Sequence, residues 1–211
     1  MEILYNDTAT SLWPIGILIS VIILVALSRR TRNLSFLFFL SIFEAYVLLA
    51  IDKIFFPIEI NGLYVDVMRN EPLMSQINLI PFYFDQYGLT PASFWGIVNN
   101  IILTMPFGFG LNFITHLRAR NFVWLGLVLG FGFETTQLII SLVLRYPYRN
   151  IDINDVLLNA IGVLIGYGLF RIFALLYLEI TKLFDIKHEG LSAYIYKVAS
   201  QARTNFNAKS A

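Results

Sequence analysis

The amino-acid sequence predicts an all-α polytopic membrane protein, a bundle of about five transmembrane helices with the N-terminus outside and the C-terminus inside. Hydrophobic residues make up 57% of the chain and charged residues only 14%, whereas about a quarter of an ordinary soluble domain is charged. Five apolar segments each approach the roughly 20 residues that cross a hydrocarbon core. Basic residues cluster in alternate connections between these segments, which is the pattern that sets membrane orientation.

The first two segments run from about Ser11 to Ser28 and from Leu34 to Phe56. Acidic residues precede the first segment and three arginines follow it: Arg29, Arg30 and Arg32. This charge order differs from that of a cleavable signal peptide and indicates an anchor whose N-terminus lies outside. The second segment carries Glu44 and Asp52, so its end is less sharply marked.

The remaining three segments run from about Ile97 to Thr115, from Phe122 to Leu144 and from Val156 to Tyr177. Pro106 interrupts the third, and a proline inside a helix causes a kink unless neighbouring helices compensate for it. With five spans, the connection after the third segment lies in the cytoplasm, and its arginines agree with that side.

The chain divides into one membrane domain, residues 1–178, and a cytoplasmic tail, residues 179–211. The long connection between the second and third segments falls outside and is mainly acidic. Apolar residues recur at helical spacing in the tail. Two interpretations of the tail stay open: an amphipathic helix along the inner membrane surface, or a solvated and partly disordered chain.

Polar residues form a stripe on the fourth segment. Glu134 lies thirteen positions along a helix that runs outward, or about 20 Å at 1.5 Å per residue, which places it towards the outer leaflet. Gln137 and Ser141 share its face. An ionisable group within a span is costly, so Glu134 is a candidate functional residue. Arg149 is the nearest candidate partner for its charge.

Two further stripes begin on the same outer side. The fifth segment contributes Asp155, Asn159, Gly162 and Gly166, and the third contributes Asn100, Thr104, Gly108 and Asn112. If the three stripes face one another, as the cost of burying polar groups in lipid favours, they line a cavity in the outer half of the membrane.

Each stripe also has a structural interpretation. Asn100, Thr104 and Asn159 are equally suited to hydrogen-bonding one helix to another, and the glycines favour close helix packing. Asp152 and Asp155 are placed to cap the fifth helix.

The residues between positions 78 and 166 resemble the VanZ-like family. The resemblance rests on Asn78-Leu79-Ile80-Pro81-Phe82, Asn99-Asn100, Met105-Pro106-Phe107-Gly108, Glu134-Thr135-Thr136-Gln137, and Arg149-Asn150-Ile151-Asp152-Ile153-Asn154-Asp155 followed by Asn159 and Gly162. It implies a small multi-pass protein of the bacterial cytoplasmic membrane, in a family named for a member associated with teicoplanin resistance. It implies no agreed biochemical activity.

Two functions of different classes follow. The first is a protein that binds a membrane lipid, a lipid-linked precursor or the tail of a lipoglycopeptide. The expected ligand-binding residues are Asn78, Asn100, Gln137, Arg149 and Asn159. The second is an enzyme that modifies a lipid or lipid-linked substrate, with Glu134, Asp152 and Asp155 as catalytic residues. A transporter ranks third, because the chain has no detectable inverted repeat.

Other chemistry is poorly represented in the sequence. Cysteine is absent, and His116 and His188 are both predicted on the cytoplasmic side, so no cysteine or histidine set predicts a metal site. In the enzyme hypothesis, Asp152 or Asp155 either orients Glu134 or binds a divalent cation. The sequence identifies no cofactor, and no strongly basic face indicates nucleic acid as a partner.

Overall fold

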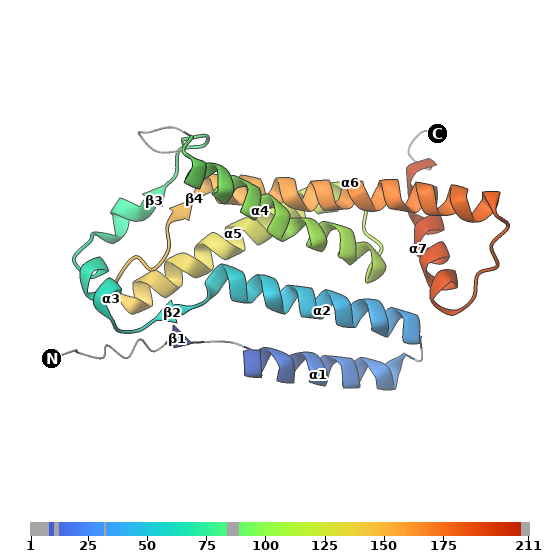
Figure 1. Ribbon diagram of the computed structural model, residues 1–211, viewed down its shortest axis with the longest axis horizontal. Coiled ribbons are helices and arrows are strands. Elements are labelled where there is room, and N and C mark those ends of the chain that lie inside the picture. The colour runs from blue at the N-terminus through green and yellow to red at the C-terminus, as the bar shows by residue number, and fades with distance from the viewer. Residues whose placement is uncertain (1–8, 11–12, 32, 84–88, 208–211) are drawn as a thin grey trace.

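The computed structural model describes residues 9–10, 13–31, 33–83 and 89–207. The described residues form five long apolar helices, which run roughly along the longest axis of the molecule in Figure 1. All five have the length and composition of membrane spans: α1 (Trp13–Arg30), α2 (Leu34–Phe55), α4 (Pro91–Gly110, continued by the 3-10 turn η2, Leu111–Phe113), α5 (Ala119–Leu144) and α6 (Ile153–Leu183). The predicted all-α polytopic fold is therefore confirmed.

Short elements connect the long helices at the end of the molecule where α6 begins. They are β1 (Ala9–Thr10), β2 (Ile58–Glu59), α3 (Leu63–Met68), the 3-10 turn η1 (Leu73–Gln76), β3 (Ile77–Asn78) and β4 (Ile151–Asp152). Strands β1 and β2 pair antiparallel. Strands β3 and β4 pair parallel, with Asn78 opposite Asp152. The second pair ties the long connection before α4 to the first residues of α6.

Capping residues explain why two helices begin earlier than the apolar segments indicate. The side chain of Thr90 accepts a hydrogen bond from the Ser93 amide and Pro91 occupies the first turn, so α4 begins six residues before Ile97. Asp152 caps α6 in the same way, accepting from the Asn154 amide. Pro106 does not end α4, which continues to Gly110.

Helix α6 is the centre of the bundle, because α4 packs along one side of it and α5 along another. Glycines make the approach close. A Cβ atom added at Gly166 would collide with the backbone carbonyl of Met105 on α4, and one added at Gly130 of α5 would lie 2.7 Å from the Cα atom of Val156. The predicted packing role of the Gly162 and Gly166 step agrees with this geometry.

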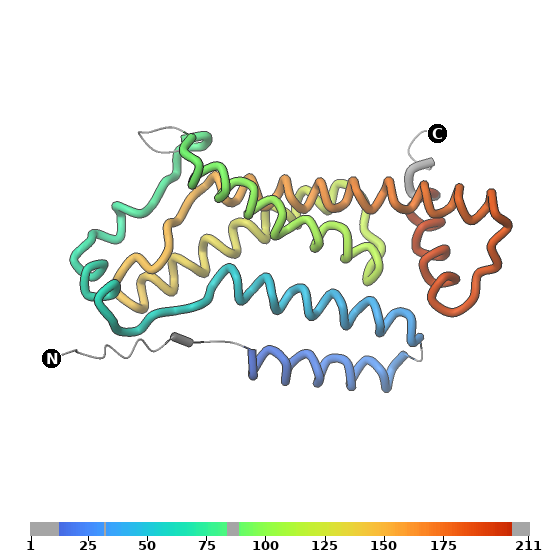
Figure 2. The backbone as a smooth tube through the Cα atoms, in the orientation of Figure 1, coloured from blue at the N-terminus to red at the C-terminus, as the bar shows by residue number. Residues whose placement is uncertain are grey.

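Helix α1 lies at the edge of the bundle. The backbone tube in Figure 2 places α1 beside α2 and far from α6. Among the α1 residues that the structure describes, only Gly16 is buried. At that position, the added Cβ atom would approach a flexible Leu48 side chain rather than backbone. The contact between α1 and α2 is therefore much less constrained than the contacts around α6.

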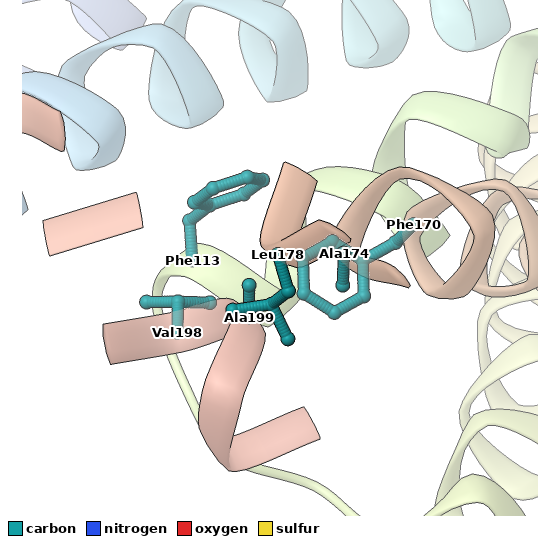
Figure 3. Packing of buried hydrophobic residues seen from close by; sticks show 6 residues of the cluster. All are labelled: Phe113, Phe170, Ala174, Leu178, Val198 and Ala199. Carbon is teal, nitrogen blue, oxygen red and sulfur yellow. The ribbon is translucent and has the colours of Figure 1, made fainter. Parts of the chain in front are cut away.

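The tail forms a helix, α7 (Gly190–Asn207), which crosses the direction of α6 in Figure 1. Its Val198 and Ala199 pack on Phe113, Phe170, Ala174 and Leu178, as Figure 3 shows. The Tyr194 hydroxyl donates to the Phe113 carbonyl at 2.5 Å. Of the two interpretations of the tail, residues 190–207 therefore adopt the helical one, with the apolar side packed against the bundle.

Candidate functional site

The candidate site is a polar cluster where α4, α5 and α6 meet the β3–β4 pair. We define the polar cluster as Asn78, Asn100, Glu134, Asp152, Asn154 and Asp155. The peptide N–H of Asp152 donates to Oε2 of Glu134 at 2.9 Å. Glu134 is buried. The contact therefore holds one carboxylate of α5 against the first turn of α6.

Asp152 is also engaged through its own side chain. Its Oδ1 accepts from the Asn154 amide at 2.8 Å and from Nδ2 of Asn78 at 3.0 Å. The first bond is the helix cap anticipated for this residue, because an aspartate at this position satisfies a free amide of the first turn. The second joins α6 to β3. Asp152 thus has a clear structural role in addition to any chemical one.

Asn154 holds a loop against the site, and sequence reasoning missed it. Its Oδ1 accepts from the Phe82 amide at 2.7 Å, and its Nδ2 donates to the Tyr83 carbonyl at 2.9 Å. Phe82 has the left-handed φ of 63°, so the loop turns sharply where Asn154 holds it. The stripe through Asp155 excluded Asn154, which points about 100° away around the helix.

Two contacts join α4 to α6 within the first two turns after the Asp152 cap. Asn100 Nδ2 donates to Asp155 Oδ1 at 2.5 Å. The Thr104 hydroxyl donates to the Asn159 carbonyl at 2.9 Å. The predicted facing of these two stripes is therefore confirmed. Oδ1 of Asn159 is buried, and no residue in the described ranges hydrogen-bonds it.

Gln137 and Arg149 contact the end of α2 rather than the carboxylates. Gln137 Nε2 lies 3.4 Å from the Ile54 carbonyl oxygen, and Arg149 Nη2 donates to the Phe56 carbonyl at 3.2 Å. These carbonyls belong to the last turn of α2 or follow it directly, where donors and positive charge are favourable. The expected pairing of Arg149 with Glu134 is not formed between these described side chains.

Two hydroxyl groups near the site are buried without a partner among the described residues: Ser141 Oγ and the Tyr148 hydroxyl. Burial raises the pKa of Tyr148 to about 12, while the charge of Arg149 opposes the rise and that of Glu134 adds to it. Because the pKa is far above neutral, the phenol keeps its proton and can donate a hydrogen bond at physiological pH. Buried polar groups without partners commonly mark a position for water or a ligand.

The site brings three acidic side chains together. Glu134 lies close enough to Asp152 and Asp155 for their charges to act on it. No lysine or arginine nitrogen in the described part of the chain lies within 4.0 Å of these three carboxylates, and no described group of three His, Cys, Asp or Glu residues is arranged to hold a metal ion. The arrangement therefore suits a ligand that brings hydrogen-bond donors or positive charge.

An apolar loop lies directly beside the polar cluster. We define it as residues Leu79 to Tyr83. Leu79 is 69% exposed and Phe82 is 77% exposed, although the hydrogen bonds of Asn154 fix the backbone next to them. Residues 84–88, which follow this loop, lie outside the described residues. The site thus places exposed apolar side chains next to the buried carboxyl group of Glu134 and the partly buried ones of Asp152 and Asp155.

Comparison with known proteins identifies one family. The model of the VanZ/LLP1 family matches residues 43–174, a range that contains the whole polar cluster. No curated protein and no solved structure matches the chain.

Proposed function

This chain belongs to the VanZ/LLP1 family, and we propose that it binds an amphiphile at the outer leaflet of the bacterial cytoplasmic membrane. The amphiphile is a lipid, a lipid-linked envelope precursor or the acyl tail of a lipoglycopeptide such as teicoplanin. The chain is a multi-pass membrane protein, so a ligand with a hydrocarbon tail reaches it through the bilayer.

One observation carries the proposal: carboxyl groups that have no cationic partner among the described residues lie beside an exposed apolar loop. A head group that carries hydroxyl or amino groups can donate to Glu134 and Asp155. A hydrocarbon tail can contact Leu79 and Phe82. Asn78, Asn100 and Asn159 act as the polar residues that orient the head group, while Gln137 and Arg149 position the end of α2 beside it.

The proposal requires the polar cluster to face outward. Basic residues at the end of α1 and in the connection before α5 support this orientation, because such residues mark the cytoplasmic side. A reporter at the N-terminus or near Met68 is expected to read as external, and one near Ala119 or at Ala211 as cytoplasmic. An external C-terminus would contradict the orientation and the outer-leaflet site with it.

Binding is tested by identifying the lipids that remain with the purified protein. The protein is extracted from native membranes, and the retained lipids are quantified by mass spectrometry for the original chain, Glu134→Gln and Asp155→Asn. Both variants keep the shape of the side chain and remove its charge, so each is expected to insert normally. The amount of one lipid class retained with each variant is expected to fall at least tenfold. Glu71→Gln, an exposed residue of the same connection as Asn78, is the control and retains it. Unchanged lipid content in both site variants would overturn the proposal.

The family name motivates a test in cells. Expression in a susceptible Gram-positive host is expected to raise teicoplanin tolerance more than vancomycin tolerance, because only the first drug carries an acyl tail. The measurement is the growth-inhibitory concentration of each drug, with surface expression verified. Unchanged sensitivity to both drugs would count against a resistance role for this chain.

A second candidate function is a membrane enzyme, favoured by the closeness of Glu134 and Asp155. Neighbouring carboxylates can share one proton, which leaves one as a general base and the other as an acid. Asp152 is less available, because its side chain caps α6 and binds Asn78. Chemical change of the retained lipid on incubation, lost in Glu134→Gln, would favour the enzyme. Retention without change favours the binding protein.

A further inference from the structure

A second carboxylate lies within the membrane region, far from the polar cluster. Glu44 is the eleventh of the 22 residues of α2, so it lies about 15 Å from either end of that helix. This depth corresponds to the middle of a hydrocarbon core about 30 Å thick. A carboxyl group at such a depth is costly and is a functional hypothesis in its own right.

Glu44 lines a groove between α1 and α2. The α1–α2 groove has a volume of about 420 Å³, within the range of small-molecule sites. Its lining is apolar apart from Glu44, Asp52 and Ser20. Glu44, Leu48 and Asp52 follow one another at four-residue spacing on the α2 face towards α1. The contact of Gly16 with Leu48 places Ser20, one turn along the antiparallel α1, at about the depth of Glu44.

No described lysine, arginine or histidine forms an ion pair with Glu44. Its Oε2 atom is buried, and no described residue hydrogen-bonds it. The described ion pairs lie elsewhere, between Arg69 and Asp66 and between Arg203 and Glu179. Interhelical hydrogen bonding, the usual structural reason for a polar residue in a span, therefore does not account for this oxygen.

We propose that the α1–α2 groove binds a lipophilic ammonium, a protonated amine on a hydrocarbon chain. Charge complementarity carries the assignment: a carboxylate without a partner in apolar surroundings is stabilised by a ligand that brings the opposite charge and an apolar body. The ammonium group of the ligand pairs with Glu44, and its hydrocarbon chain lies along the apolar walls formed by Ile19, Ile23 and Val47. The exposed position of α1, held mainly by α2, leaves this site accessible from the lipid.

The test is a scintillation proximity assay with tritiated dodecylamine on the purified full chain in maltoside micelles. Saturable binding is expected, and unlabelled dodecylamine should displace the label at least tenfold more effectively than dodecanol, which has the same chain without the charge. This comparison uses the original chain alone, so it does not depend on the folding of any variant. Equal displacement by dodecanol would overturn the proposal, because the groove would then recognise the hydrocarbon chain of the ligand and not its charge.

Variants locate the bound amine. Glu44→Gln is expected to weaken dodecylamine binding at least tenfold, while Glu44→Asp, which keeps the acid, retains most of it. Glu179→Gln, on the exposed surface of α6, is the matched control and leaves binding unchanged. Full binding by Glu44→Gln would contradict the assignment.

Discussion

The bundle of α4, α5 and α6 differs from the pair α1–α2 in how closely the helix backbones pack. In the first region, glycines bring the backbones together, and the polar groups of Asn100, Thr104 and Asp155 pair across helices. In the second, one glycine meets a flexible leucine and Glu44 keeps a buried oxygen without a described partner. Close backbone packing thus pairs Asn100, Thr104 and Asp155 across helices, although it leaves Oδ1 of Asn159 without a described partner. The looser pair leaves the buried oxygen of Glu44 without a described partner.

The largest expected effect comes from adding a methyl group at the close contacts. Gly166→Ala would force α6 away from the Met105 carbonyl, and we expect a loss of about 3 kcal/mol or failure to fold. Gly16→Ala requires only a new position of the Leu48 side chain and is expected to change stability by about 0.5 kcal/mol or less. Thermal unfolding in detergent measures both. Similar losses at the two positions would abolish the contrast between the regions.

The next effect is expected at the residue that fastens the apolar loop. Asn154→Ala removes both hydrogen bonds to the backbone of Phe82 and Tyr83, at an expected cost of about 2 kcal/mol. Hydrogen exchange of the peptides around residue 80 should accelerate. Asn70→Ala, which removes an exposed bond to the Asp66 carbonyl, serves as control. Unchanged exchange in Asn154→Ala would show that the apolar loop is held by other contacts.

A smaller effect is expected at a single interhelical hydrogen bond. Thr104→Val keeps the shape of the side chain and removes the donor to the Asn159 carbonyl, with an expected loss of about 1 kcal/mol. Ser20→Ala, in the α1–α2 groove, should change stability by no more than about 0.3 kcal/mol, on the scale of tolerated surface changes. The pair is compared by thermal unfolding. A larger loss at Ser20 would indicate that the groove is a packed interface.

A further small effect is expected where the two regions meet. Arg149 makes one described side-chain bond, to the Phe56 carbonyl, and a lysine can donate to the same oxygen. Arg149→Lys is therefore expected to cost less than about 1 kcal/mol, whereas a bidentate arginine does not tolerate this change. Unfolding and lipid retention are measured together. Loss of the retained lipid with normal stability would assign Arg149 to the head group instead.

The sequence predicted the spans and the facing of the α4 and α6 stripes because both depend on periodicity within single helices. Gln137 of the third stripe contacts the end of α2 instead. Asn100 and Asp155 were expected to face each other, and they do. The roles of Asn154 and Arg149 could not be predicted, because both side chains bind backbone carbonyls more than 70 residues away, and carbonyls are present at every position of a chain. The predicted start of α4 was too late, because it followed the first apolar residues of the span. The helix begins instead at its cap, Thr90 followed by Pro91.

The central claim is that the carboxylates beside the apolar loop contact the head group of an amphiphile. A density map of the protein purified with native lipids tests it most directly. We predict head-group density in contact with Glu134 or Asp155, continuous with a hydrocarbon tail along Leu79 and Phe82. Lipid density confined to the outer faces of the helices, with only water between these carboxylates, would contradict the account.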